Sequence, residues 1–393
     1  MPIAHSSASK EVVTAALLMI GGKILSGRTK DQNIGYIAEY LTAVGIIAVG
    51  ACGFPVSAAD LFKVGFVFRD SVGEYGWTYQ HELGRVAIEK KFGNRISTNY
   101  LANVDDGLAS ERSIEQLARS GQKLIFTTSV GFMDPTIKIA KKYPNVFFEQ
   151  NMGYVRDANV ATYSARSYEG RFIQGQIAAK MSRTGVLGYI GSYPIPEVIS
   201  GINSTMLGAQ SVNQNIKIKI IWLNTWFDPD KEADAARTLL EEGADALMQH
   251  TESPAPTKVA SEQNKFAFGQ VSDMIKFGPK SQLTAIINNW APYYIDRVQL
   301  LLDGKWTPGE VWGGLNTKMI TMAPYTNVPD DVKNQAIETE AAISAKILHP
   351  FKCPVFAQSG NVVECKGGAN LDDEQILGMN FYVKGIDDKM PSK

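Results

Sequence analysis

Short apolar runs alternate with amphipathic segments along the chain from residue 60 onward. The run at residues 63–68 (KVGFVF) is β-rich and continuous, the pattern of a buried strand in a parallel sheet. A polar turn at residues 69–76 follows, and apolar positions then recur at helical spacing as far as residue 90. Such a unit holds its loop at the carboxyl end of the strand, which is where open α/β sheets bind small molecules.

The alternation continues and then repeats. Further strands are predicted at residues 96–101, 123–127, 146–150, 160–163, 185–190, 216–223, 244–249 and 265–269. The intervening helices are predicted at residues 110–120, 136–142, 168–181, 195–213, 230–242 and 255–263. Two successive series of this kind predict an α/β protein with two Rossmann-like lobes, each a parallel sheet flanked by helices, facing a shared cleft.

The last part of the chain is expected to join the lobes. Residues 283–287, 291–302 and 315–322 are too few for a third domain, so they are predicted to cross back as a multi-strand hinge. We therefore assign residues 60–163 with 289–314 to an N-terminal lobe, and residues 164–288 with 315–393 to a C-terminal lobe.

Residues 1–59 have a different pattern and are predicted to be an export segment. The apolar run LTAVGIIAVGA is too short to span a bilayer and follows several basic residues, as in a secretory signal. Cleavage near Ala58 would release a soluble periplasmic protein. A lipobox ending in Cys52 would instead give a lipid-anchored form, although Val49 stands where such motifs usually have Leu.

Charge and cysteine content narrow the function classes. The chain has 39 Lys and Arg against 40 Asp and Glu, with no dense basic run, so nucleic acid is not an expected partner. Cys353 and Cys365 flank two short β-like runs around a turn, which would bring them nearly opposite each other. A disulfide and a pair of buried thiols both fit this pattern.

The loops after the predicted strands contain three tryptophans, namely Trp77, Trp226 and Trp290. Indole platforms with nearby Asp, Asn, Ser and Thr groups suit a planar, neutral, hydrogen-bonding ligand such as a nucleobase or nucleoside. For Trp290 we favour packing in the core. For Trp77 and Trp226, packing against the protein and stacking on a ligand fit the sequence equally well. Asp273 has two interpretations as well, as a ligand acceptor or as a cap of the next helix.

Catalytic and metal-binding signatures are missing from the sequence. His81-Glu82 begins an HExxH motif, but Arg85 occupies the fifth position, and there is no P-loop or G-x-S-x-G motif. His250, beside Thr251 and Glu252, is in the one polar cluster that could perform acid–base chemistry, but such a histidine is more often a ligand contact or a satisfied loop residue. We predict no metal, no cofactor and no enzymatic activity.

Several of these loops resemble the basic membrane protein family. The relevant segments are GWTYQHELG, RSYEGRFIQGQIA, TWFDPDKEADAA, QHTESPAP, GQVSDM and NNWAPYYI, and the similarity runs from residue 62 to the end. The resemblance implies a type I periplasmic-binding-protein fold. It also implies a role as the purine or nucleoside substrate-binding protein of an ABC importer, which closes on its ligand and delivers it to a permease.

The resemblance further implies a set of ligand contacts. Trp77 and Trp226 match the family's aromatic residues that stack on the two faces of the base. Gly131 and Met133 match residues that line the floor of the binding site. Asp273 matches the acidic residue that holds the ribose hydroxyls or an edge of the ligand. Thr251, Ser253 and Asn288 complete the predicted set. The family's nucleoside binders have Lys near position 288 and an Asp-Gly-x-Phe-Asn-Asp loop at residues 70–75, and both are changed here. A free base such as adenine is therefore as well supported as adenosine.

Other functions are alternatives to purine or nucleoside binding. A binding protein for a sugar or another small ligand would use the same architecture and the same indoles. A lipoprotein that senses its ligand is a further alternative. A nucleoside hydrolase would need a carboxylate cluster or an activated nucleophile in the cleft, which the sequence alone does not assemble. We expect the protein to be monomeric.

Overall fold

The computed structural model describes residues 61–366 and 368–391. The export segment, with Cys52 and Ala58, lies outside the described residues. Among the residues that are described, no helix is long and apolar enough to cross a membrane.

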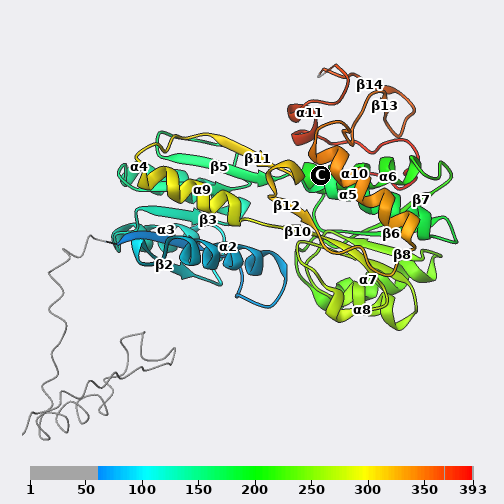
Figure 1. Ribbon diagram of the computed structural model, residues 1–393, viewed down its shortest axis with the longest axis horizontal. Coiled ribbons are helices and arrows are strands. Elements are labelled where there is room, and N and C mark those ends of the chain that lie inside the picture. Colours follow the sequence, from blue (N-terminus) through cyan, green and yellow to red (C-terminus); the bar gives the residue numbers. More distant parts are fainter. Residues whose placement is uncertain (1–60, 367, 392–393) are drawn as a thin grey trace, which may run out of the picture. The chain divides into compact units, whose positions relative to one another are not determined.

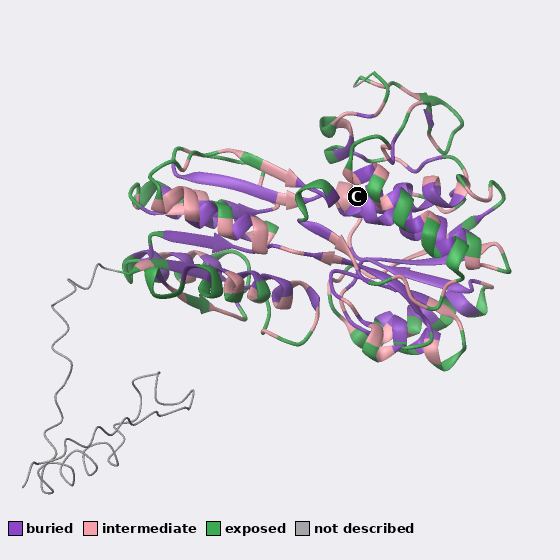
Figure 2. Ribbon diagram, in the orientation of Figure 1, coloured by how far each residue is buried: buried purple, intermediate pink, exposed green. Residues whose placement is uncertain are grey.

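The first sheet has six strands in the order β11-β5-β4-β3-β1-β2, and every neighbouring pair is parallel (Figure 1). Its strands are β1 (Phe62–Val67), β2 (Ile96–Leu101), β3 (Leu124–Thr127), β4 (Phe147–Asn151), β5 (Val160–Ala165) and β11 (Glu310–Gly313). Helices α2 (Gly76–Phe92), α3 (Leu108–Arg119), α4 (Met133–Lys142) and α9 (Ala291–Leu302) cover it. All of β3 is buried, as expected for a central strand with helices on both faces (Figure 2). We call this sheet and its helices the first lobe.

The second sheet repeats the arrangement in the order β12-β10-β9-β8-β6-β7, with β12 antiparallel to β10. Its strands are β6 (Val186–Gly191), β7 (Lys217–Trp222), β8 (Ala246–Gln249), β9 (Phe266–Gly269), β10 (Gln282–Asn288) and β12 (Ile320–Met322). Its helices are α5 (Ser167–Met181), α6 (Pro196–Gln210), α7 (Pro229–Glu241), α8 (Ala255–Glu262) and α10 (Asp330–Ser344). We call this sheet and its helices the second lobe.

Helices α5 and α6 approach each other closely enough to require glycine. A Cβ atom at Gly175 would overlap the carbonyl of Thr205, and one at Gly208 would overlap the carbonyl of Phe172. These two glycines let the helices pack backbone against backbone, so the side chains of α5 reach the loops at the carboxyl end of the second sheet.

The chain passes between the two sheets three times, after β5, after β10 and after β11. The predicted strand at residues 315–322 is instead a short 3-10 turn, η4 (Leu315–Thr317), followed by β12. The missed strand is β11 (EVWG), which is mostly exposed or half-buried at the edge of the sheet and so lacks the apolar run that marks the equally short β3. The exact lobe boundaries at residues 163, 288 and 314 stay a prediction.

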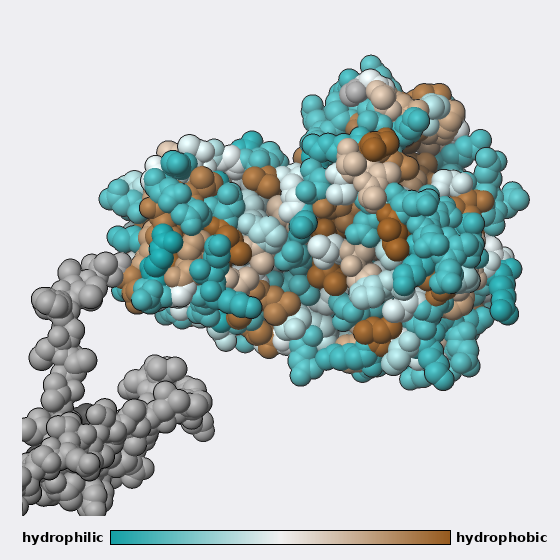
Figure 3. Space-filling model, viewed as in Figure 1, coloured by the Kyte–Doolittle hydropathy of each residue, from teal (hydrophilic) through white to brown (hydrophobic). Residues whose placement is uncertain are grey.

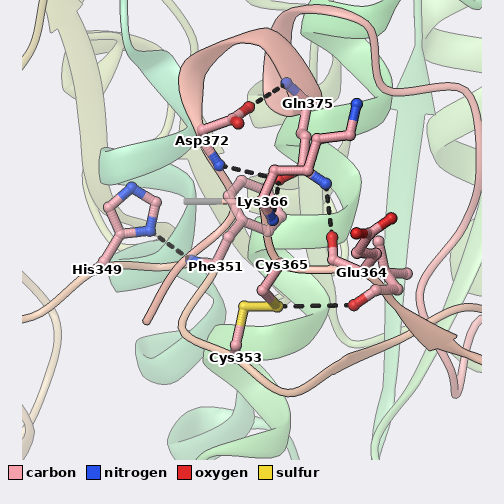
Figure 4. Close-up of a disulfide and its surroundings, with 9 residues drawn as sticks. His349, Phe351, Cys353, Glu364, Cys365, Lys366, Asp372 and Gln375 are labelled. Carbon is pink, nitrogen blue, oxygen red and sulfur yellow. Dashed lines mark hydrogen bonds between the residues drawn. A yellow bond between two sulfur atoms is a disulfide. The ribbon is translucent and has the colours of Figure 1, made fainter. Parts of the chain in front are cut away.

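The C-terminal segment packs on the second lobe. It contains the hairpin β13 (Val355–Phe356) with β14 (Val362–Val363) and helix α11 (Asp373–Leu377). Cys353 and Cys365 form a disulfide across this hairpin, with Cα atoms 6.5 Å apart, which settles the choice between the two predicted thiol states (Figure 4). Asn203 of α6 donates a hydrogen bond to the Phe381 carbonyl at 2.7 Å and so ties the segment to the lobe.

Candidate ligand-binding site

A cavity of about 360 Å³ lies between the carboxyl ends of the two sheets. Its volume falls within the roughly 300–1,000 Å³ of small-molecule sites. The first lobe contributes Arg69, Asp70, Trp77, Asp106, Thr128, Ser129, Val130 and Met152. The second lobe contributes Tyr193, Ile195, Glu197, Trp226, His250, Glu252, Gln270 and Val271. Most of these residues lie in the loop directly after a parallel strand, where open α/β sheets bind their ligands.

Trp77 is held against the cavity wall by its neighbours in the first lobe. Its indole nitrogen donates a hydrogen bond to the Thr128 carbonyl at 2.6 Å. Its ring meets Trp290 edge-on, with centroids 5.6 Å apart, and Trp290 stacks on His81 at 4.9 Å. Trp290 and His81 are fully buried, whereas Trp77 is half-buried and lines the cavity. The predicted packing role of Trp290 is therefore confirmed.

Trp226 reaches the same cavity from the second lobe. It lies in the loop between β7 and α7, in which Asn224 has a φ of 52°, in the left-handed region that asparagine tolerates. Asp228 ends the loop and caps α7 by accepting a hydrogen bond from the Lys231 amide at 3.1 Å. The Trp226 ring is half-buried and lies 5.3 Å from the Tyr193 ring, centroid to centroid. Each lobe thus supplies one half-buried indole to one cavity.

The ionisable groups of the cavity are mostly acidic. Asp70 and Asp106 are exposed at its edge, and Glu197 and Glu252 are half-buried in its wall. The Arg69 guanidinium lies 2.7 Å from the carboxylate of Asp105, which stands outside the lining residues. Such a site disfavours phosphate groups and favours neutral ligands with N–H or O–H donors.

His250 adds no positive charge at neutral pH. Burial lowers the pKa of its imidazole below the ordinary value, so the ring is neutral near pH 7. Its Nδ1 is hydrogen-bonded to the Tyr189 hydroxyl at 3.2 Å.

Glu252 connects the two lobes. One of its carboxyl oxygens accepts a hydrogen bond from the Trp77 amide in the first turn of α2, at 2.9 Å. Beside it, the Ser272 hydroxyl accepts from the Gly76 amide and from the Gln80 side chain, both at 2.9 Å. The first N–H groups of a helix have no partners within the helix, so side chains of the second lobe satisfy them here. Burial, with smaller contributions from Asp70, Glu232 and Glu197, raises the pKa of Glu252 to about 8, although the hydrogen bond from the Trp77 amide acts in the opposite direction.

Of the eight predicted ligand contacts, Trp77 and Trp226 line the cavity. Gly131 lies in a short 3-10 turn, η2 (Val130–Phe132), where a Cβ atom would overlap the Asp106 carboxyl, and Met133 is buried at the start of α4. Neither is among the lining residues, and their predicted role as a floor stays a prediction.

The other four predicted contacts also lie outside the lining residues. Ser253 is buried and donates from its hydroxyl to Glu232 at 2.7 Å, and Thr251 is buried beside it. Asp273 accepts from the Ile275 amide at 3.0 Å and from the Gln282 side chain at 2.7 Å, but it is not the N-cap of the 3-10 turn at Ile275–Phe277, so neither of its predicted roles is seen. Asn288 is buried at the end of β10.

The lining residues that sequence reasoning did not select include Asp70, Tyr193, Glu197, Glu252 and Gln270. Each lies within a few residues of a strand's carboxyl end, and that position is the signal that would have found them. The structure also gathers the carboxyl cluster that the sequence did not assemble. Among the described residues, no group of His, Cys, Asp or Glu is arranged to hold a metal ion. His81 faces Tyr294 in the core, 2.5 Å from its hydroxyl, and not the cavity.

Two α/β lobes joined by three crossings, with a ligand-sized cavity between them, define the class of two-lobed periplasmic binding proteins. Solved structures of the same fold include solute-binding proteins of ABC transporter systems. One is from Conexibacter woesei, with a TM-score of 0.62 and 18% identity over 73% of this chain and 97% of that one. Another is from Aeropyrum pernix, with a TM-score of 0.63 and 17% identity over 75% of this chain and 94% of that one. The predicted fold class is confirmed.

The family follows from the sequence comparison. The model of the PnrA-like ABC transporter substrate-binding proteins matches residues 61–352, and the chain belongs to this Bmp family. It is 51% identical over 350 residues to a purine-binding protein of Brucella abortus, covering 89% of this chain and 99% of that protein. It is 31% identical over 352 residues to a candidate ABC transporter glucose-binding protein of Haloferax volcanii, covering 89% and 86%. The family and the Brucella relative are binding proteins and not enzymes.

Proposed function

We propose that this protein is the substrate-binding component of an ABC importer and that it binds a purine base or nucleoside between its lobes. The observation that carries the proposal is the pair of half-buried indoles, Trp77 from one lobe and Trp226 from the other, that line one cavity of about 360 Å³. Indole faces stack on flat aromatic ligands, with each stacked base contributing roughly 1–3 kcal/mol. The purine-binding relative at 51% identity supports the same ligand class.

The acidic cavity supports a base or nucleoside and disfavours a nucleotide. Its carboxylates accept hydrogen bonds from ring and exocyclic N–H groups or from ribose hydroxyls. A phosphate would meet the same carboxylates without a free cationic partner, because Arg69 is already engaged by Asp105.

Closure of the lobes follows from the two-sided site. A ligand that contacts both lobes binds the closed form better than the open form and therefore shifts the population toward closure. The closed protein is the form that delivers its ligand to the permease.

We further propose that it acts as a monomer in the periplasm after export. Intact mass of the exported protein would distinguish cleavage near Ala58 from a lipid on Cys52.

Native mass spectrometry of freshly purified protein, followed by calorimetric titration with adenine, adenosine, AMP and glucose, tests the proposal. We expect a retained or added mass matching a purine, a Kd in the micromolar range or tighter (about −8 kcal/mol), and much weaker binding of AMP. Glucose binding without purine binding would replace this function with that named for the Haloferax relative. Free adenine released from adenosine would instead identify a hydrolase.

A further inference from the structure

The guanidinium of Arg171 is buried behind the cavity wall without a carboxylate partner. Arg171 comes from α5, its side chain is fully buried, and it forms no ion pair within the described residues. Oxygens of Gln174 and Gln249 accept its hydrogen bonds at 3.0 and 2.6 Å, and Tyr189 lies against it. An unpaired buried cation is costly, so its position calls for a functional explanation.

The remaining acceptor of Arg171 is the side-chain oxygen of Gln270, which follows β9 and lines the cavity. A guanidinium has donors and no acceptor, so the Gln270 atom that faces it must be the oxygen. The NH₂ group is the other polar substituent of the same planar amide carbon, so it points away from the guanidinium. Within the described residues the Gln270 nitrogen has no hydrogen-bond partner. It is nevertheless not completely enclosed by protein atoms. Because Gln270 lines the cavity, this N–H group is left available as a donor there.

The backbone beside Gln270 is held equally firmly. Val271 has a φ of 64°, a left-handed conformation that is rare and strained for a β-branched residue. The Gln270 carbonyl accepts from the Ser272 amide at 2.6 Å, and the Val271 carbonyl accepts from the Asn288 amide at 3.0 Å. Strain of this kind persists where surrounding contacts fix it, and it is often found at ligand sites.

We propose that Gln270 determines specificity by presenting a fixed N–H donor to an unprotonated ring nitrogen of the ligand, and that Arg171 is the positioning residue that orients it. This proposal rests on the purine-binding function above and identifies one recognised edge of that ligand. Carboxylates of the cavity accept hydrogen bonds, and hydroxyls can donate or accept. The oriented amide can only donate toward the cavity, so it selects ligands with a lone pair at one position.

The test is a double-mutant cycle between Gln270 and the ring nitrogens of the ligand. Adenine and its 1-, 3- and 7-deaza analogues, in which one nitrogen becomes C–H, are titrated into the native protein and into Gln270→Glu. The Glu side chain keeps the volume and the contact with Arg171 but lacks the NH₂ group. We expect one deaza analogue to bind the native protein about tenfold more weakly than adenine. In Gln270→Glu, adenine should lose about tenfold while that analogue is unaffected.

Further variants separate positioning from folding. Gln270→Met removes the donor without adding a charge and should abolish the same discrimination, with thermal unfolding checking that both variants fold. Arg171→Lys should weaken the discrimination without abolishing binding, because a point charge no longer fixes the amide plane. If native protein binds purines but every deaza penalty persists in the Gln270 variants, this proposal is overturned and the proposed function stands. If native protein binds no purine, both are wrong.

Discussion

Replacing Glu252 by Gln should remove a pH dependence from lobe closure. The two lobes touch at this carboxyl, which accepts a hydrogen bond from the Trp77 amide at 2.9 Å, and we therefore take the structure as the closed form. Burial here raises the pKa of Glu252 from an ordinary 4.5 to about 8. In an open form the carboxyl meets water and titrates near its ordinary value. Closure therefore takes up a proton between these two pKa values. Because the pKa is raised in the closed form, closure is favoured at low pH and loses free energy as the pH rises toward 8.

The size of the effect follows from the pKa difference. Each unit corresponds to about 1.4 kcal/mol, so the full difference sets an upper limit of about 5 kcal/mol. The carboxyl is half-buried and keeps contact with the cavity, so water screens part of this. If screening leaves about 2 kcal/mol of this free energy coupled to closure, ligand affinity should fall about 30-fold between pH 5 and pH 8.

The assay is calorimetric titration at several pH values with a purine whose own charge is constant over the range. Gln keeps an oxygen that can accept from the Trp77 amide but does not titrate, so its affinity should change much less with pH. His250 and the other cavity carboxyls are present in both proteins, so the difference between the two profiles isolates Glu252. Parallel profiles for the two proteins would refute the reasoning.

Three further predictions concern stacking and stability. Trp226→Ala should weaken purine binding by about 1–3 kcal/mol in calorimetry, whereas Trp226→Phe should keep most of it, and equal loss in both would argue against stacking. Replacing Cys353 and Cys365 together by Ser should lower the free energy of unfolding by roughly 3 kcal/mol in denaturant titrations, because the bond joins residues 12 positions apart. Arg297→Met should cost roughly 3–5 kcal/mol, because Glu149, fully buried and 2.6 Å from Arg297, loses its cationic partner. Adding Glu149→Gln should recover part of that loss, and additive losses in the double variant would contradict this pairing.

Much of the fold is visible in the sequence because it depends on local pattern. The continuous apolar runs at β1 and β3 reflect burial on both faces, and the repeat of strand and helix sets the α/β class. The four-residue strand β11 is not predicted from the sequence, because its pairing with β5 defines it and its own sequence has no clear period. Residues 315–322 were assigned to one strand because their composition does not show that a turn divides them.

The sequence by itself determined where strands end, and hence that indoles and polar groups gather at the edges of two sheets. It did not determine which of them share the cavity. Trp77 and Trp226 fitted packing and stacking equally by sequence, and only the structure places both of them at one cavity. The contact of Trp77 with Glu252 joins residues 175 positions apart, and that of Arg171 with Gln270 joins residues 99 apart. Only tertiary packing decides such pairs, because periodicity reports which way a residue faces and not what it meets there.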